Sequence, residues 1–138
     1  MKKLTTLLLV FVALCLMAFS GCVDVGNFSA KHGDTVIITV TDEVANGTTL
    51  LDYMEDINGG DVVKSYVIKD GMLTVINQME AKGNTYWMLY TDDVEYSNED
   101  WGTVEVDGVI YRSATLGAEE LPVKEGCTYI WQAQTFSW

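Results

Sequence analysis

The first clear pattern along the chain is an alternation of apolar and other residues at positions 34–41. Val36, Ile38 and Val40 fall two residues apart, so an extended backbone places them on one side. Two threonines lie on the opposite side. A period of two is typical of a half-buried strand, and the sequence therefore predicts a first strand here.

One later segment has helical spacing instead. Leu50 and Met54 recur four residues apart and belong to a single apolar stripe. Thr49 followed by Asp52 is a capping-box pattern, which satisfies free backbone N–H groups at a helix start. An Asn-Gly-Gly run then ends the segment. We expect one short helix at residues 48–56.

Two Asp-Gly pairs lie between alternating apolar runs and predict β-hairpins with type I′ turns. The first pair is Asp70-Gly71 and the second is Asp107-Gly108. The flanking runs are residues 65–68 and 72–76 for the first pair, and residues 103–106 and 109–111 for the second.

Two further runs are strongly aromatic and read as strands. The first covers residues 85–91, and the second closes the chain at residues 127–136. Residues 113–126, with the only proline at Pro122, form the connecting loop. The closing strand is a candidate for a central position in the sheet. One helix on a mainly antiparallel sheet predicts the α+β class.

The N-terminus has the pattern of an export signal. Lys2 and Lys3 precede an apolar run at residues 7–19, and small residues lead to Cys22. This order is typical of a secretory signal peptide, and the run is too short to span a membrane. Phe19-Ser20-Gly21-Cys22 resembles the bacterial lipobox, in which the cysteine is acylated and becomes the first mature residue.

The expected domain organisation follows from cleavage of the signal peptide before Cys22. Residues 1–21 form the lipoprotein signal peptide, residues 22–33 a tether, and residues 34–138 one domain. Acylation at Cys22 would hold the protein on the extracytoplasmic face of a membrane, since each buried CH₂ contributes about 0.8 kcal/mol. An ordinary signal peptide with a coincidental cysteine remains the alternative. Cys127 is then unpaired, so no disulfide is expected within the mature chain.

The negative net charge of the chain restricts the classes of partner that it can bind. It has 138 residues with 8 Lys and Arg against 20 Asp and Glu, a net charge of −12. Two of the basic residues lie in the signal segment, so 6 remain against 20 acidic residues, a net charge of −14. Nucleic acid is excluded as a partner, because binding it needs Lys and Arg to neutralise phosphates. A polybasic membrane patch is excluded for the same reason.

Four short motifs occur in a fixed order through the predicted domain. They are Thr49-Leu50-Leu51-Asp52, Ile76-Asn77, Tyr86-Trp87-Met88-Leu89-Tyr90 and Leu121-Pro122-Val123-Lys124-Glu125-Gly126. In this order they resemble the transcobalamin-like C-terminal domain family of exported bacterial proteins, over about residues 34–136. The resemblance implies a β-grasp-like domain. The animal cobalamin carriers cover one face of cobalamin with this domain, so cobalamin or a related corrinoid is an alternative ligand.

Aromatic residues are the first candidates for a binding surface. Alternation places Trp87 on one face of its strand and Tyr90 on the other. One face must belong to the core, and an uncovered second face would stack on a flat ligand or a partner. Trp101 follows a run of acidic residues. We therefore expect Trp87, Tyr90 and Trp101 to face a ligand, with ordinary core packing as the alternative.

Five acidic side chains between positions 92 and 100 are a second candidate. Carboxylate oxygens are calcium ligands, and Asp92, Asp93 and Glu95 have alternating spacing. The glycine and distal glutamate of an EF-hand loop are not in place. The sequence therefore predicts a solvated acidic loop between strands, with a calcium site as the alternative and no other metal.

Catalysis finds little support in the residue types present. The single histidine, His32, lies in the tether, so a Ser-His-Asp set cannot form. No glycine-rich phosphate loop follows a strand. We expect a lipid-anchored cell-surface binding or adhesion module without catalytic activity or a cofactor, which binds another envelope protein or a small planar ligand.

Overall fold

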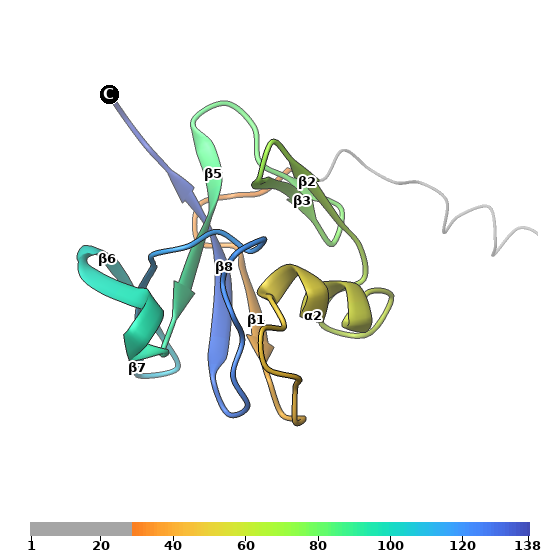
Figure 1. Ribbon diagram of the computed structural model, residues 1–138. Coiled ribbons are helices and arrows are strands. Elements are labelled where there is room, and N and C mark those ends of the chain that lie inside the picture. The colour runs from red at the N-terminus through yellow and green to blue at the C-terminus, as the bar shows by residue number, and fades with distance from the viewer. Residues whose placement is uncertain (1–28) are drawn as a thin grey trace, which may run out of the picture.

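The computed structural model describes residues 29–138 (Figure 1). The predicted signal peptide, Cys22 and the first part of the predicted tether lie outside these residues. The elements are β1 (Thr35–Thr39), α2 (Leu50–Ile57), β2 (Tyr66–Lys69), β3 (Met72–Ile76), β4 (Met79–Glu80), β5 (Thr85–Thr91), the 3₁₀ turn η1 (Val94–Tyr96), β6 (Ser97–Val106), β7 (Val109–Ala114) and β8 (Thr128–Thr135). The α+β class is therefore confirmed.

The larger sheet has five strands in the order β1-β8-β5-β7-β6, and every neighbouring pair is antiparallel. The closing strand β8 lies between β1 and β5, which confirms its predicted central position. It pairs with the whole of β1 and the whole of β5. With a partner strand on each side, the backbone N–H and C=O groups along both edges of β8 are hydrogen-bonded. Strand β8 thus connects β1 to the rest of the sheet.

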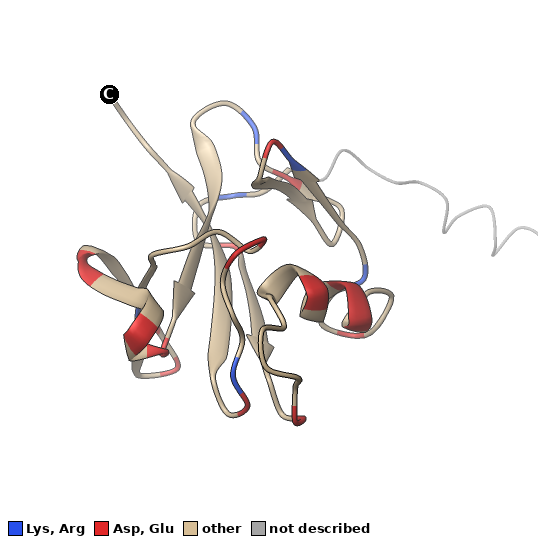
Figure 2. Ribbon diagram, viewed as in Figure 1, with Lys and Arg blue, Asp and Glu red and all other residues tan. Residues whose placement is uncertain are grey.

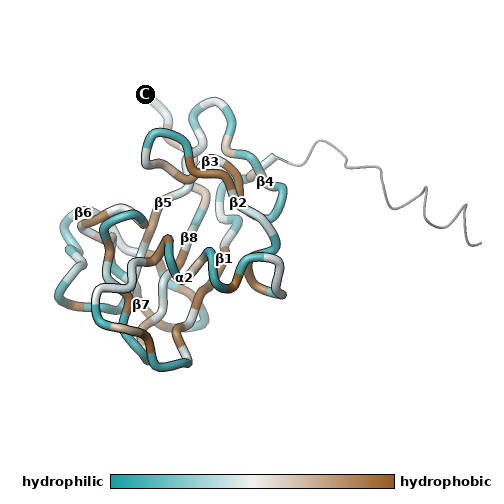
Figure 3. The backbone as a smooth tube through the Cα atoms, turned by 45° about the vertical axis from the view of Figure 1, so that its right-hand side comes forward, coloured by the Kyte–Doolittle hydropathy of each residue, from teal (hydrophilic) through white to brown (hydrophobic). Residues whose placement is uncertain are grey.

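A second sheet, which the sequence analysis did not predict, contains three strands in the order β2-β3-β4. The hairpin of β2 and β3 was expected, but β4 has only two residues and is too short to give a periodic signal. Val75 pairs with Glu80 and Ile76 pairs with Met79. Figure 3 shows these three strands together at one end of the molecule, with the hydrophobic stretch of β3 among them.

Helix α2 begins with the predicted capping box. The Asp52 N–H donates to Thr49 Oγ1 at 3.2 Å, and the Thr49 N–H donates to Asp52 Oδ2 at 3.1 Å. The next two N–H groups are satisfied by the loop before β8. Leu50 donates to the Leu121 carbonyl at 2.8 Å, and Leu51 donates to the Ala118 carbonyl at 2.9 Å. The start of the helix therefore fixes the path of that loop.

The main core lies between α2 and one face of the larger sheet. Leu50 and Met54 of the helix are fully buried there, together with Ile38 of β1 and Tyr129 of β8. A smaller cluster of Tyr90, Val104 and Ile130 lies on the opposite face, where β6 and β7 curve over the sheet. Both faces of β8 are therefore covered along part of its length.

Both Asp-Gly turns are confirmed. Asp70 and Gly71 have φ angles of 54° and 78°, and Asp107 and Gly108 have φ angles of 51° and 79°. Positive φ at both central residues defines a type I′ turn, whose twist matches that of the paired strands.

Two predicted boundaries need correction. The acidic segment at residues 92–100 was expected as a loop, but it contains η1 and the first residues of β6. Here β6 pairs Ser97 with Ala114 and Asn98 with Ser113 before a bulge. Pairing with β7 therefore forms a strand in a segment whose polar sequence favours a loop.

In the segment expected as a tether, Ala30 is buried in the core and donates its N–H to the Glu80 carbonyl. Packed structure therefore extends before Asp34.

Replacement of Met54 by alanine should lower the free energy of unfolding by about 2–5 kcal/mol, because it leaves a cavity in a closed core. Leu51→Ala is the matched control. It removes the same number of heavy atoms from the same helix, but Leu51 is only half-buried. The loss of unfolding free energy in Leu51→Ala should stay below about 2 kcal/mol. Urea unfolding measures both, and equal losses would show that α2 does not dock as described.

Candidate functional site

A cavity lies at the point where β7 leaves β5. These two strands pair only at Tyr90–Ser113 and Thr91–Arg112. After Ala114 the chain turns away into the loop that reaches α2. Residues 85–89 of β5 therefore have no strand on that side within the described chain. A cavity of about 330 Å³ lies against this open edge.

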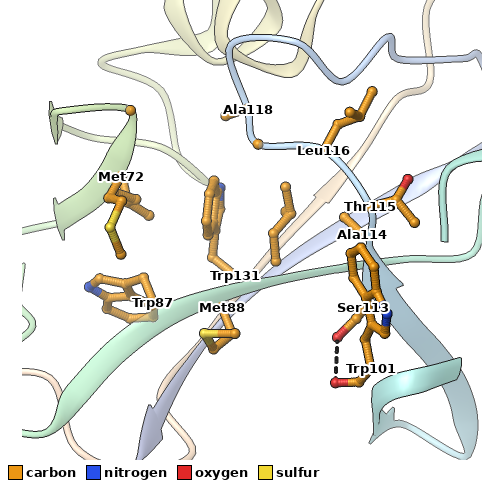
Figure 4. A pocket seen from close by; sticks show the side chains of 14 residues that line it. Met72, Trp87, Met88, Trp101, Ser113, Ala114, Thr115, Leu116, Ala118 and Trp131 are labelled. Carbon is orange, nitrogen blue, oxygen red and sulfur yellow. Dashed lines mark hydrogen bonds between the residues drawn. The ribbon is translucent and has the colours of Figure 1, made fainter. Parts of the chain in front are cut away.

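Two tryptophans form one wall of the cavity (Figure 4). Trp87 of β5 is opposite Ala133 of β8, and Trp131 of β8 is opposite Leu89 of β5. This register places both indoles on the same face of the sheet. Both side chains are almost fully buried. The Trp87 Nε1–H donates to the Met79 carbonyl at 3.3 Å, which fixes the ring against the smaller sheet.

A third tryptophan lies at the other side of the cavity. Trp101 belongs to the bulged part of β6, and 64% of it is exposed. Its carbonyl accepts a bond of 3.4 Å from the Ser113 hydroxyl, which also lines the cavity. Next to it, Gly102 has a φ angle of 127°, a value that side chains disfavour. Figure 4 shows the Trp101 ring across the cavity from Trp87 and Trp131.

The remaining lining is almost entirely apolar. Met72 and Leu73 come from β3, Met88 from β5, and Leu116 and Ala118 from the loop. One polar group in the wall is unsatisfied: the Nε1–H of Trp131 is buried and has no hydrogen-bond partner. A buried donor without a partner costs about 1–3 kcal/mol. Because this nitrogen is closed off from solvent, the unpaired donor belongs to the packed side of the Trp131 ring and not to the open face of the cavity.

Tyr90 is separated from the other two predicted ligand-facing residues. It lies on the opposite face of β5, buried with Val104 and Ile130. Burial raises the pKa of its phenol. The alternation that predicted opposite faces for Trp87 and Tyr90 is confirmed, but the open platform expected at Tyr90 is not found, because the β6–β7 hairpin covers it.

Two of the three acidic candidates contact a lysine. Lys124 Nζ lies 3.1 Å from Asp93 Oδ1 and 2.5 Å from Glu95 Oε2. It also lies 5.3 Å from the centre of the Tyr96 ring, a cation–π distance. Asp93, expected as solvated, is only 4% exposed. The third candidate, Asp92, accepts the Thr128 N–H at 2.8 Å. The ammonium group of Lys124 thus supplies a positive charge to Asp93 and Glu95.

These contacts shift the titration of the partners. The hydrogen bond from Lys124 lowers the pKa of Glu95. In return, the Glu95 carboxylate and then Asp93 raise the pKa of Lys124.

Between positions 29 and 138, no three His, Cys, Asp or Glu side chains are grouped to hold a metal ion. Calcium at this cluster stays a prediction, and an ion there would have to displace Lys124.

Three tryptophans line the cavity; the sequence predicted Trp87 and Trp101 as ligand-facing and did not single out Trp131. Its strand was recognised, but only the register of β8 against β5 brings it beside Trp87. Met72 and Leu116 were also missed, because nothing local connects a hairpin and a loop with an aromatic strand. The arrangement can hold a flat or apolar group by stacking and dispersion contacts.

No helix among residues 29–138 is long and apolar enough to cross a bilayer. Comparisons with protein-family models, with curated proteins and with solved structures found no match for this chain.

Lys124→Met should lower the melting temperature more than Lys82→Met. Both changes remove an ammonium group, but only Lys124 faces a buried carboxylate, Asp93, whereas the Glu80 partner of Lys82 is half exposed. Scanning calorimetry measures both variants. Equal shifts would show that the Lys124 cluster contributes no more than a surface pair.

The same cluster predicts a pH dependence. A carboxyl group whose pKa is lowered by folding stabilises the protein above its ordinary value of 4.5, and this contribution is lost as the pH falls. Folding raises the pKa of Lys124, so its contribution to the unfolding free energy is lost only as the pH rises above 10.5. Unfolding free energy should therefore fall more steeply below pH 4.5 in the natural protein than in Lys124→Met. Parallel acid profiles would contradict this linkage.

Proposed function

We propose that this chain is a lipid-anchored binding module on the extracytoplasmic face of the membrane, without catalytic activity of its own. The observation that carries this proposal is the tryptophan-lined cavity at the divergence of β5 and β7. Indole rings and thioethers offer a large apolar contact surface. The Ser113 hydroxyl in its wall is already engaged with the Trp101 carbonyl. These groups suit the holding of a ligand better than its chemical conversion.

The family resemblance adds a finer proposal, a β-grasp-like domain of the transcobalamin-like C-terminal type. Its support is the succession of a strand, the one α-helix of residues 29–138 and further strands, with β8 inside the larger sheet. The motif at Thr49–Asp52 starts the helix, and the motif at Leu121–Gly126 anchors it through Leu121. These two motifs are therefore joined by a structural contact, which gives their order in the sequence a physical reason.

The proposed anchor agrees with the charge of the domain. Acyl chains on Cys22 would attach the chain, while a net charge of −14 would be repelled by anionic lipid headgroups. This repulsion keeps the surface of the domain away from the bilayer and accessible to a partner. We infer that the partner is another envelope protein or a small planar ligand, held at the tryptophan cavity.

Cobalamin or a related corrinoid is the alternative ligand, and its support is the resemblance. A cavity of about 330 Å³ is at the small end of ligand sites, which span about 300–1,000 Å³. A corrin ring is much larger than a single aromatic ring. A corrinoid would therefore lie across the mouth of the cavity, against Trp101, with only one substituent inside.

Binding at the cavity has a direct spectroscopic test, because the chain has four tryptophans and three of them line the cavity. Small single-ring aromatic compounds, added to the ¹⁵N-labelled full chain, should shift the indole N–H resonances of Trp87, Trp101 and Trp131. Trp138 is 87% exposed at the end of the chain and is the internal control. Its resonance should stay in place.

The same sample tests the corrinoid alternative. Added cobalamin should shift the Trp101 resonance most and stay with the protein through desalting if it is the ligand. If no compound of either kind moves the three cavity indoles, the cavity is not a binding site and the proposal fails. Shifts in all four indoles would indicate unspecific association.

The anchor is tested separately. Cys22→Ser should move the protein from the membrane fraction to the soluble extracytoplasmic fraction, because the acylated side chain is lost. Cys127→Ser is the matched control, since it removes a thiol from the domain and should leave the protein in the membrane fraction. Mass spectrometry of the natural protein should show an acylated Cys22 at its N-terminus, and an intact Met1 would contradict the anchor.

A further inference from the structure

The side of β5 that faces away from β8 carries main-chain groups that no neighbouring strand pairs. Ala133 of β8 donates its N–H to the Asp34 carbonyl at 2.8 Å and accepts the Gly33 N–H at 2.9 Å, so its main-chain groups point toward β1. Trp87, its partner in β5, therefore directs its own N–H and C=O to the other side. The alternation does the same for Leu89. Within residues 29–138, no strand pairs with Trp87 or Leu89 on that side.

Two cavities follow this unpaired edge. The tryptophan cavity is lined by three consecutive residues of β5, Trp87, Met88 and Leu89. Since consecutive side chains of a strand point to opposite faces, a space that all three line lies at the edge of the strand and not on one face. A second cavity of about 350 Å³ is lined by the two preceding residues, Thr85 and Tyr86. The two cavities therefore extend along the edge from residue 85 to residue 89.

The hairpin of β2 and β3 forms a wall that both cavities share. Met72 and Leu73 line each of them, so the two spaces adjoin at these side chains. Met72 is 55% exposed and unbranched, and such a side chain adapts to the shape of what lies beside it. The two cavities together, between residues 85–89 of β5 and this hairpin, form an edge groove.

The edge groove is almost without charge, which restricts the class of ligand. Strand β5 has no charged residue along its length (Figure 2). Of the residues that line the two cavities, only Lys69 and Asp70 are charged, and their signs are opposite. An uncharged occupant complements this lining, because burying an unpaired charge there would cost free energy. Pairing with a strand edge further requires alternating N–H and C=O groups, which an extended polypeptide provides.

We propose that the edge groove binds an uncharged, extended segment of a partner polypeptide by strand addition to β5. This inference rests on the proposed function and identifies the partner of that site as a polypeptide. The segment forms hydrogen bonds with the main chain of Trp87 and Leu89, and its alternate side chains enter the two cavities. Five residues of extended chain span about 17 Å, which is the length of residues 85–89.

Amide hydrogen exchange of the full chain tests the open edge without any ligand. Met88 pairs with Gln132 of β8 through its main chain, so its N–H should exchange slowly. The N–H groups of Trp87 and Leu89 should exchange about tenfold faster or more, because no strand holds them. Equal protection of the three amides would show that the edge is already closed, which would overturn strand addition.

The binding probe is a capped heptapeptide of alternating valine and serine, which is uncharged and carries apolar side chains on one face. Its matched control is the same peptide with every main-chain nitrogen methylated, which removes the donors and keeps the side chains. Each is titrated into the ¹⁵N-labelled full chain. The unmodified peptide should slow the exchange of the Trp87 and Leu89 amides about tenfold and shift their resonances. The methylated peptide should do neither.

A variant pair tests the apolar wall of the groove. Met72→Glu replaces a side chain that lines both cavities by a carboxylate, and it should weaken the binding of the heptapeptide about tenfold. Val109→Glu is the matched control. Val109 also follows an Asp-Gly turn and is exposed to a similar extent, but it lines neither cavity. Its replacement should leave the affinity unchanged. Because both positions are exposed, folding should be preserved, and circular dichroism checks this.

The outcomes separate this inference from the proposed function. If the two peptides bind equally, or if neither binds while single-ring aromatic compounds still shift the cavity indoles, strand addition is wrong and the binding site stands. If light scattering shows a dimer whose Trp87 amide loses protection on dilution, a second copy occupies the groove and the partner polypeptide is wrong. If neither the peptides nor the aromatic compounds bind, both proposals fail together.

Discussion

The fold depends on the central position of β8. Its antiparallel pairing with β1 and β5 joins the beginning, the middle and the end of the described chain in one sheet. The pairing register then decides which residues share a face, because a slip of one residue would turn every side chain to the other side. Tyr129, Trp131 and Ala133 face the helix and the main core, whereas Ile130 faces the smaller cluster under β6 and β7. The core and the candidate site therefore arise from the same register.

The cavity follows from an interruption in this sheet. Strand β7 pairs with only two residues of β5 before the chain leaves toward the start of α2, where two N–H groups bind the carbonyls of Leu121 and Ala118. A loop held by a helix start cannot also continue as a strand beside β5. The open edge that results is lined from both sheets and from the loop, so the capping of one short helix determines where the cavity lies.

Charge has different roles in two parts of the molecule. At the turn after β5, Lys124 neutralises Asp93 and Glu95, and the cluster serves the structure by fixing η1 against the loop before β8. The lining of the cavity, in contrast, contains no charged side chain. An acidic composition alone does not distinguish these two cases. The contacts of each carboxylate do, because an ammonium group a few ångströms away offsets its charge.

Local signals in the sequence determined most of the elements. The period of two in β1 and β5, the capping pair at Thr49 and Asp52, and the two Asp-Gly turns are short-range effects of backbone geometry, and the structure has all of them. The sequence also identified Trp87 and Trp101 as candidates from their type. Only the tertiary structure decided that Tyr90 is covered, that Trp131 joins Trp87, that β4 exists and that Asp93 is buried. Each of these depends on strand register or on contacts between residues far apart in the chain, and neither leaves a periodic trace in the local sequence.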